Sequence, residues 1–166
     1  GYSVNISARD VRQKGFVTDV LTVIAGEPGG AVAALDLEIT ESVIMHDIER
    51  YIGDLKKLRA KGVGIDIDDF GTGYSSLSYI AKLPITALKI DRSFINAMGA
   101  GNDGLSIVSS IISLAHSLNL TVVAEGVETA AQRDMLKLLK CDTVQGYFIS
   151  KPLPANEIAA MLESRS

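Results

Sequence analysis

Residues 65–76 read IDIDDFGTGYSS, and this stretch decides how the rest of the chain is interpreted. Apolar and acidic residues alternate as in a strand, and Asp66, Asp68 and Asp69 then fall within four positions, ahead of two glycines. Side chains alternate between the two faces of a strand, and carboxylates this close together repel one another. By itself the stretch fits both a strand that ends in a solvated acidic turn and a strand that ends in a divalent-cation site.

The composition is that of a globular domain. The chain has 166 residues, of which 47% are hydrophobic and 22% are charged, so we treat residues 1–166 as a single domain with its own core. The net charge of −4 argues against binding to a nucleic acid polymer. The longest apolar stretch, residues 105–124, is interrupted by polar residues, so no membrane contact is expected. A single cysteine and the lack of a signal peptide predict a cytoplasmic location.

Short apolar runs alternate with helical patterns along the whole chain. The predicted strands cover residues 2–7, 32–39, 62–68, 85–91, 121–126 and 143–148. The predicted helices cover residues 8–25, 47–61, 75–82, 103–118, 129–140 and 155–164. Ser7 and Thr129 stand at helix N-cap positions, and Gly26 and Gly62 are expected just past helix ends. This repeated order predicts an α/β fold of parallel strands joined by right-handed crossovers.

A polar residue at or near the C-terminal end of each predicted strand distinguishes an open sheet from a barrel. These residues are Asn5, Glu38, Asp68, Lys89, Glu125 and Gln145. Their neighbours in sequence are mostly apolar, so one face of each strand is expected to pack against helices and the other to carry the polar group. A TIM-like (β/α) barrel gathers such groups into one ring, where barrel enzymes place their chemistry. Such a barrel has eight strands and we count six, which predicts a barrel truncated at its N-terminus.

The predicted ring favours a metal site. Glu38, Asp68, Asp69 and Glu125, together with Asn5, offer hard oxygen ligands, which suit Mg²⁺ or Mn²⁺ better than Zn²⁺. Two such ions, shared through Asp68, would relieve the repulsion among the acids and form the usual clamp for displacement at phosphorus.

Several other polar residues could act in or near this ring. Lys89 could orient water or stabilise developing charge. We expect Lys89 and Glu125 to lie in the open ring and not in the core. Glu128 is either a support for Glu125 or an acid at a helix start, and Glu41 is either a helix-start acid or an anchor for the loop after Asp68.

Two further acids, Asp36 and Asp66, are expected to face the barrel interior below the ring. Buried acids need partners. Ser3, Thr143 or Lys89 could serve, or one acid could stay protonated.

Six segments together carry a resemblance to a known family. They are VNISARD (4–10), LEITES (37–42), IDDFGTGYSSL (67–77), LKIDRSFI (88–95), VVAEGVET (122–129) and QGYFISKPLP (145–154). In order and spacing the chain resembles the EAL family of cyclic di-GMP phosphodiesterases. The resemblance implies a site with two ions, Mg²⁺ or Mn²⁺, that hydrolyses cyclic di-GMP to linear pGpG.

The resemblance also implies a role for each matching residue. Asn5, Glu38 and Asp68 would hold one ion, and Asp68 and Asp69 the second. Lys89 would contact the attacking water, Glu125 would belong to the catalytic and metal-binding acids, and Glu128 would support it. Gln145 would hold a water or a nearby group, and Glu41 would anchor the flexible loop.

The Glu-Ala-Leu segment that gives the family its name, and a nearby arginine, do not occur in the 166 residues. We expect both to precede Gly1, and we expect these residues alone to be inactive. The family also implies a homodimer and upstream sensory or GGDEF-type domains, in a protein that could be membrane-anchored. The alternative function is a catalytically inactive receptor that binds cyclic di-GMP and acts through protein–protein interaction.

Overall fold

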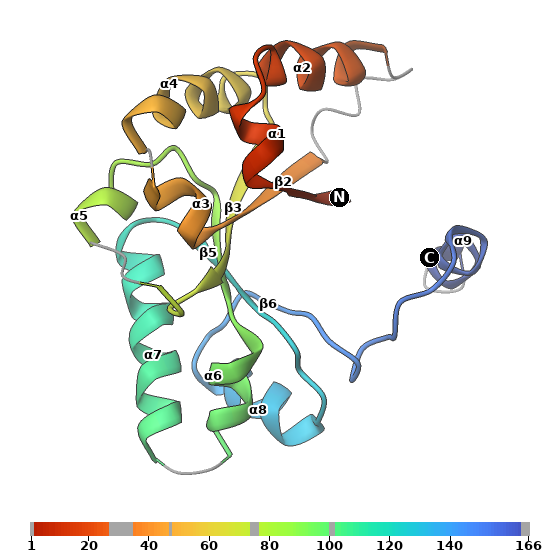
Figure 1. Ribbon diagram of the computed structural model, residues 1–166. Helices are drawn as coiled ribbons and strands as arrows, with labels where there is room; N and C mark the ends of the chain where they lie inside the picture. The colour runs from red at the N-terminus through yellow and green to blue at the C-terminus, as the bar shows by residue number, and fades with distance from the viewer. Residues whose placement is uncertain (1, 27–34, 47, 74–76, 100–101, 164–166) are drawn as a thin grey trace.

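The computed structural model describes residues 2–26, 35–46, 48–73, 77–99 and 102–163, and its centre is one parallel sheet (Figure 1). The strands are β1 (Tyr2–Ile6), β2 (Leu35–Thr40), β3 (Gly64–Phe70), β4 (Ala87–Ile90), β5 (Thr121–Ala124) and β6 (Thr143–Val144). They lie side by side in sequence order, and all five described pairs are parallel. The predicted α/β architecture, six strands of a TIM-like barrel, is confirmed.

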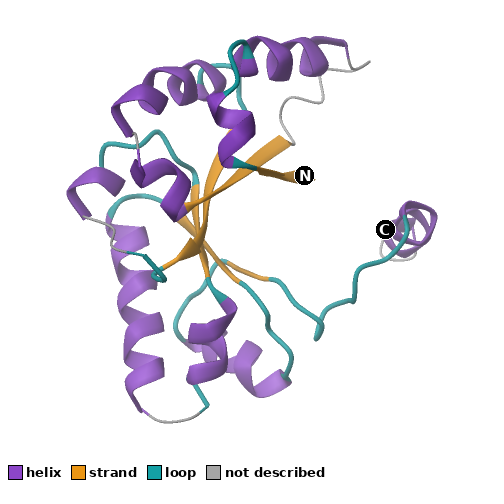
Figure 2. Ribbon diagram, in the orientation of Figure 1, coloured by secondary structure: helices purple, strands orange, loops and turns teal. Residues whose placement is uncertain are grey.

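Helices follow the strands and flank the sheet, as Figure 2 shows. They are α1 (Ala8–Arg12), α2 (Phe16–Gly26), α3 (Glu41–His46), α4 (Ile48–Arg59), α5 (Leu77–Ile80), α6 (Arg92–Ala97), α7 (Asn102–Ser117), α8 (Ala130–Leu138) and α9 (Ala155–Glu163). The single helix predicted over residues 8–25 is wrong. Two helices, α1 and α2, occupy this range, and the turn between them contains Gly15, whose φ is +96°. The short helices α3 and α6 were not predicted. No helix in the described ranges is long and apolar enough to cross a membrane.

The predicted strand over residues 143–148 is also wrong beyond Val144. Gly146 has a φ of +154°, and its carbonyl accepts hydrogen bonds from the N–H groups of Ile149 and Ser150, which forms a turn. Gln145 therefore follows the last strand instead of lying within it. Residues 32–34 of the predicted second strand lie outside the described residues.

Three of the four predicted helix-end residues, Ser7, Thr129 and Gly62, are confirmed. Ser7 forms a capping box with Asp10, and Thr129 forms one with Gln132. Gly62 follows α4 with a φ of +88°, a conformation that glycine adopts at little cost. Gly26, in contrast, is the last residue of α2 and does not lie beyond its end.

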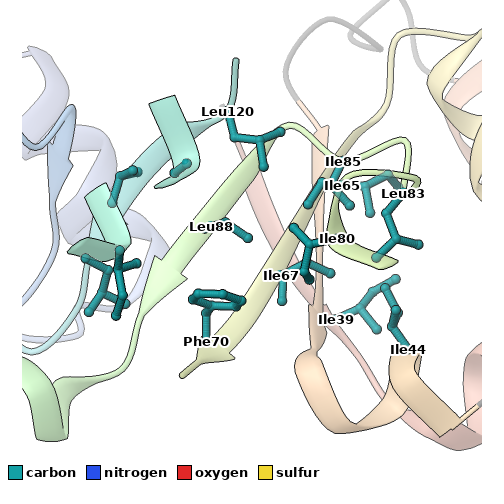
Figure 3. Close-up of a cluster of buried hydrophobic side chains, with 14 of the residues drawn as sticks. Ile39, Ile44, Ile65, Ile67, Phe70, Ile80, Leu83, Ile85, Leu88 and Leu120 are labelled. Atoms are coloured by element: carbon teal, nitrogen blue, oxygen red, sulfur yellow. The ribbon is translucent and has the colours of Figure 1, made fainter. Parts of the chain in front are cut away.

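The core lies on one face of the sheet, between the strands and the helices (Figure 3). It contains alternate strand residues, as predicted, and helix residues that pack on them. Those labelled in Figure 3 include Ile39, Ile44, Ile65, Ile67, Ile80 and Leu88. Burying one such side chain stabilises a fold by about 1.5–3 kcal/mol. The opposite face of the same strands carries Glu38, Asp66 and Lys89, which are buried as well.

Two helical glycines differ in their surroundings, which generates a paired prediction. A Cβ on Gly104, at the start of α7, would lie 2.3 Å from the carbonyl oxygen of Ala97, whereas a Cβ on Gly53, within α4, would meet nothing within 4 Å. Ala97 is the last residue of α6. Gly104→Ala should lower the free energy of unfolding by about 1–3 kcal/mol, because α6 and α7 must move apart to make room for the methyl group. Gly53→Ala should raise it by about 0.5–1 kcal/mol through helix propensity. Urea denaturation of both variants checks this, and shifts of the same sign would contradict it.

A polar contact joins α7 to the N-terminal ends of β5 and β6. The carboxylate of Asp142 lies 2.9 Å from Nε2 of His116 and accepts a hydrogen bond of 2.8 Å from the N–H of Val122. Partial burial disfavours the ionised form, but these two hydrogen bonds outweigh it and hold the pKa of Asp142 below its ordinary value of 3.8.

Because this pKa is lower in the folded state, ionised Asp142 stabilises the fold above pH 3.8, and the contribution is lost as the pH falls through the folded pKa. Asp142→Asn keeps an acceptor for the Val122 N–H but removes the charge. We expect a lower melting temperature for this variant at neutral pH and a difference that disappears in acid below pH 3.8. Thermal melts by circular dichroism across this range test the prediction, which an equal difference at every pH would refute.

Candidate active site

Lys89 is the centre of the polar face. Its Nζ lies 2.6 Å from Oε2 of Glu38, 2.6 Å from Oε1 of Glu125 and 3.3 Å from Oδ1 of Asp68. Glu38, Asp68 and Lys89 come from neighbouring strands β2, β3 and β4, and Glu125 follows β5 directly. The structure therefore brings four of the sequence-predicted site residues into contact.

The expectation that Lys89 lies in an open ring is wrong, because only 3% of its side chain is exposed. Burial alone would lower its pKa, but the hydrogen bonds to Glu125 and Glu38 outweigh burial and raise the pKa of Lys89 well above its ordinary value. Lys89 is therefore a fixed cation that cannot serve as a base near neutral pH. It also compensates the charges of its partners, which would otherwise be buried at high cost.

Glu125 sits at the more open side of this group, with 19% of its side chain exposed. Burial raises its pKa, and the contact with Lys89 only partly offsets the effect, while Asp68 and Glu38 add repulsion. A carboxylate whose pKa is raised is a better proton acceptor when ionised. Glu125 thus has the electrostatic surroundings of an acid–base residue.

Asp68, Asp69 and Glu125 form a group that could hold a metal ion. One carboxylate oxygen from each lies within 4.8 Å of the others. Neighbouring residues of a regular strand point to opposite faces, but the register between β3 and β4 shifts between Ile67 and Phe70, and Asp69 has a φ of +55°. This bulge lets two consecutive acids serve one site.

The donor set of this group fits a hard divalent cation such as Mg²⁺ or Mn²⁺, because every donor is a carboxylate oxygen. Burial and the neighbouring charges of Asp68 and Asp91 raise the pKa of Asp69. A bound cation would relieve this repulsion. The crowding of acids that was evident in the sequence is thus present in three dimensions.

Glu41 contacts the loop that follows Asp69. It is 2% exposed, and its Oε2 accepts a hydrogen bond of 2.9 Å from the N–H of Gly71. A Cβ at Gly73 would lie 2.4 Å from Oε1 of the same glutamate. A larger residue at this position would require the Glu41 carboxylate to shift, so Glu41 lies against the first residues of the loop, whereas residues 74–76 lie outside the described ranges.

The remaining predicted residues lie around this centre. Asn5 is exposed on β1 and is in register with Glu38. A pocket of about 210 Å³ opens beside Glu125, and its lining includes Arg92, Glu128, Gln145 and Tyr147. Glu128 pairs with Arg92 at 2.6 Å.

Two partners of the acids near the site were not predicted from the sequence. They are Arg92, which pairs with Glu128, and Thr86, which contacts Asp66. The hydroxyl of Thr86, which was not among the expected partners, donates a hydrogen bond of 2.9 Å to Asp66, and the charge of Lys89, which was among them, also acts on this acid. Burial raises the pKa of Asp66, and the hydrogen bond from Thr86 offsets this in part. Thr86 precedes β4 by one residue, so no strand-end pattern indicated it. Arg92 stands in the segment 88–95 that carries the family resemblance, but nothing in the sequence paired it with Glu128.

Comparison with known proteins agrees with this geometry. The chain is 45% identical over 161 residues to the bifunctional diguanylate cyclase/cyclic di-GMP phosphodiesterase MucR of Pseudomonas aeruginosa, over 95% of the chain and 23% of that protein. It is 43% identical over 162 residues to the cyclic di-GMP phosphodiesterase NbdA of the same organism, over 98% of the chain and 21% of that protein. The chain thus spans less than a quarter of the length of these relatives.

Solved structures of related proteins are also similar to this chain. The phosphodiesterase of MucR in complex with cyclic di-GMP superposes with a TM-score of 0.87 at 44% identity, over 94% of this chain and 63% of that one. The EAL domain of Mycobacterium smegmatis DcpA superposes with a TM-score of 0.89 at 40% identity, over 98% and 72%. The sequence profile of the EAL domain matches residues 1–152. With this match over most of its length, the chain belongs to the EAL domain family.

Proposed function

We propose that this chain forms part of the site with which the intact protein carries out the metal-dependent hydrolysis of cyclic di-GMP to linear pGpG. The observation that carries the proposal is the buried Lys89, which three acids surround at the C-terminal ends of parallel strands. Two of these strand ends also supply the carboxylates of Asp68, Asp69 and Glu125, which fit a divalent cation. Relatives that are 45% and 43% identical to this chain are named as cyclic di-GMP phosphodiesterases, which supports the choice of substrate.

The proposed ligands for two ions, Mg²⁺ or Mn²⁺, are Asn5, Glu38, Asp68, Asp69 and Glu125. When bound, such ions supply charge neutralisation and a clamp on the reacting phosphate. Lys89 fixes Glu38 and Glu125 against each other through its two short contacts. Because it keeps its proton, it also presents positive charge toward a phosphodiester on which negative charge develops.

The pocket beside Glu125 supports a substrate position next to these groups. Its lining includes Gln145, whose amide can both donate and accept hydrogen bonds to a water or to the substrate. Glu41 keeps the loop after Asp69 close to the site. These contacts support positioning roles for both residues.

We further propose a cytoplasmic domain within a larger signalling protein that contains sensory or GGDEF-type domains and acts as a homodimer. The relatives' much greater length and the bifunctional name of MucR support the multidomain part of this proposal.

The first test concerns the metal. In the intact protein, Asp68→Asn combined with Asp69→Asn should weaken Mn²⁺ binding by at least about tenfold, because two charged donors are lost. Titration calorimetry measures the affinity, and Asp134→Asn, an exposed acid paired with Arg133 on α8, is the matched control. Ca²⁺ should bind in competition and inhibit, because its longer and less regular bonds misplace the reacting groups. Unchanged Mn²⁺ affinity in the double variant would rule out the proposed ligands.

The second test concerns the reaction. Glu125→Gln should reduce turnover of cyclic di-GMP by about 10²–10³, as expected when one preorganised electrostatic partner is lost. Lys89→Met should abolish turnover and also destabilise the fold, because it leaves Glu38 and Glu125 without their cation. Chromatography of the pGpG formed measures the rate, and thermal melts separate the two effects. If the unmodified protein binds cyclic di-GMP and never cleaves it, the receptor alternative replaces the enzyme.

A further inference from the structure

Two polar contacts link α6 to the start of α8. Arg92 pairs with Glu128 at 2.6 Å, and Nε2 of Gln132 donates a hydrogen bond of 3.5 Å to Oδ1 of Asn96. Arg92 and Asn96 are four residues apart on α6, so both project from one face of that helix. Gln132 also accepts a hydrogen bond of 2.8 Å from the N–H of Glu128, which ties the two contacts together.

Gly126 brings Arg92 directly onto the segment that carries Glu125. Gly126 has a φ of +68°, and a Cβ at this position would lie 2.3 Å from Cγ of Arg92. The aliphatic part of Arg92 therefore lies across residues 125–128, and its guanidinium reaches Glu128 at the far end of the segment. A glycine is required here for two reasons, the backbone conformation and the close approach.

The segment 125–128 lies outside regular secondary structure, so its position depends on such contacts. Backbone hydrogen bonds hold it on both edges, from Glu125 N–H to Ile90 on the β4 side and from Val127 N–H to Gln145 on the β6 side, at 3.1 and 3.0 Å. Arg92 holds the segment from the side of α6. Asp91, the residue before Arg92, is the N-cap of α6. Its negative charge is close enough to Asp69 to contribute to the raised pKa of that acid.

We propose that Arg92 is a positioning residue for the hydrolysis. It fixes the segment 125–128 so that the Glu125 carboxylate reaches Lys89 and the carboxylates of Asp68 and Asp69 together. This inference rests on the proposed function, in which Glu125 is both a metal ligand and a catalytic group.

A purely stabilising role does not account for this arrangement. The side chains of Arg92 and Glu128 are 56% and 39% exposed, and exposed ion pairs contribute at most about 1 kcal/mol. The guanidinium is also engaged by Glu128, which directs it away from a primary role in substrate binding. Its influence is therefore expected in the placement of Glu125 and hardly at all in the stability of the fold.

The test uses Arg92→Met in the intact protein, because methionine keeps the aliphatic cover over Gly126 and removes the guanidinium. We expect kcat and Mn²⁺ affinity each to fall by up to about fivefold, the factor that corresponds to about 1 kcal/mol for an exposed ion pair. KM and melting temperature should change little. Arg92→Lys should recover part of the loss. Arg92→Met combined with Glu128→Gln should be no worse than Arg92→Met alone, because each substitution breaks the same contact.

Lys57→Met, which breaks the exposed pair with Asp54 on α4, is the matched control and should change none of these quantities.

Three results would overturn the inference. A rise in KM with unchanged kcat and Mn²⁺ affinity would make Arg92 a substrate contact. A fall in melting temperature that accounts for the lost activity would make its role structural, and no change at all would leave it without a role. If the unmodified protein binds Mn²⁺ but does not hydrolyse cyclic di-GMP, the proposed function fails, and the Mn²⁺ affinities of the variants still decide the role of Arg92.

Discussion

The buried charge of Lys89 is the constraint on which the rest of the site depends. A lysine that is 3% exposed must be compensated, and its partners come from both neighbouring strands and from the strand beyond. This requires β2 to β5 to lie side by side and in parallel, with their C-terminal ends at one edge of the sheet. The core on the opposite face, with Ile39, Ile67 and Leu88 fully buried, fixes the strands in that register.

Much of the fold could be predicted from the sequence because its signals are local. Alternation within strands gave the two faces, and a polar residue at each strand end predicted where Glu38, Asp68, Lys89 and Glu125 would meet. The ends of helices and strands were harder to predict. Gly15 and Gly146 interrupt segments whose apolar pattern continues through them, so the pattern alone could not show where a helix or strand stops.

Two partners that do not lie at predicted strand ends were the part of the site that could not be predicted. Thr86 lies 20 residues from Asp66, and Arg92 lies 36 residues from Glu128. Nothing in the residues around either acid indicates which side chain will reach it, because that depends on how the helices and loops pack. The left-handed conformation of Asp69 is similar, since it follows from the pairing of β3 with β4 and not from the residues beside it.

That conformation also restricts how this family of sites can change over time. Apart from glycine, asparagine and aspartate are the residues that most readily adopt a positive φ. At position 69 the backbone therefore accepts asparagine almost as well as aspartate, although asparagine lacks the negative charge of the carboxylate. A single amide-for-acid exchange is therefore compatible with the strand, the bulge and the glycine loop as they are, while it removes one negative charge from the group of Asp68, Asp69 and Glu125. The backbone at this position thus constrains the shape of the site more strictly than its charge.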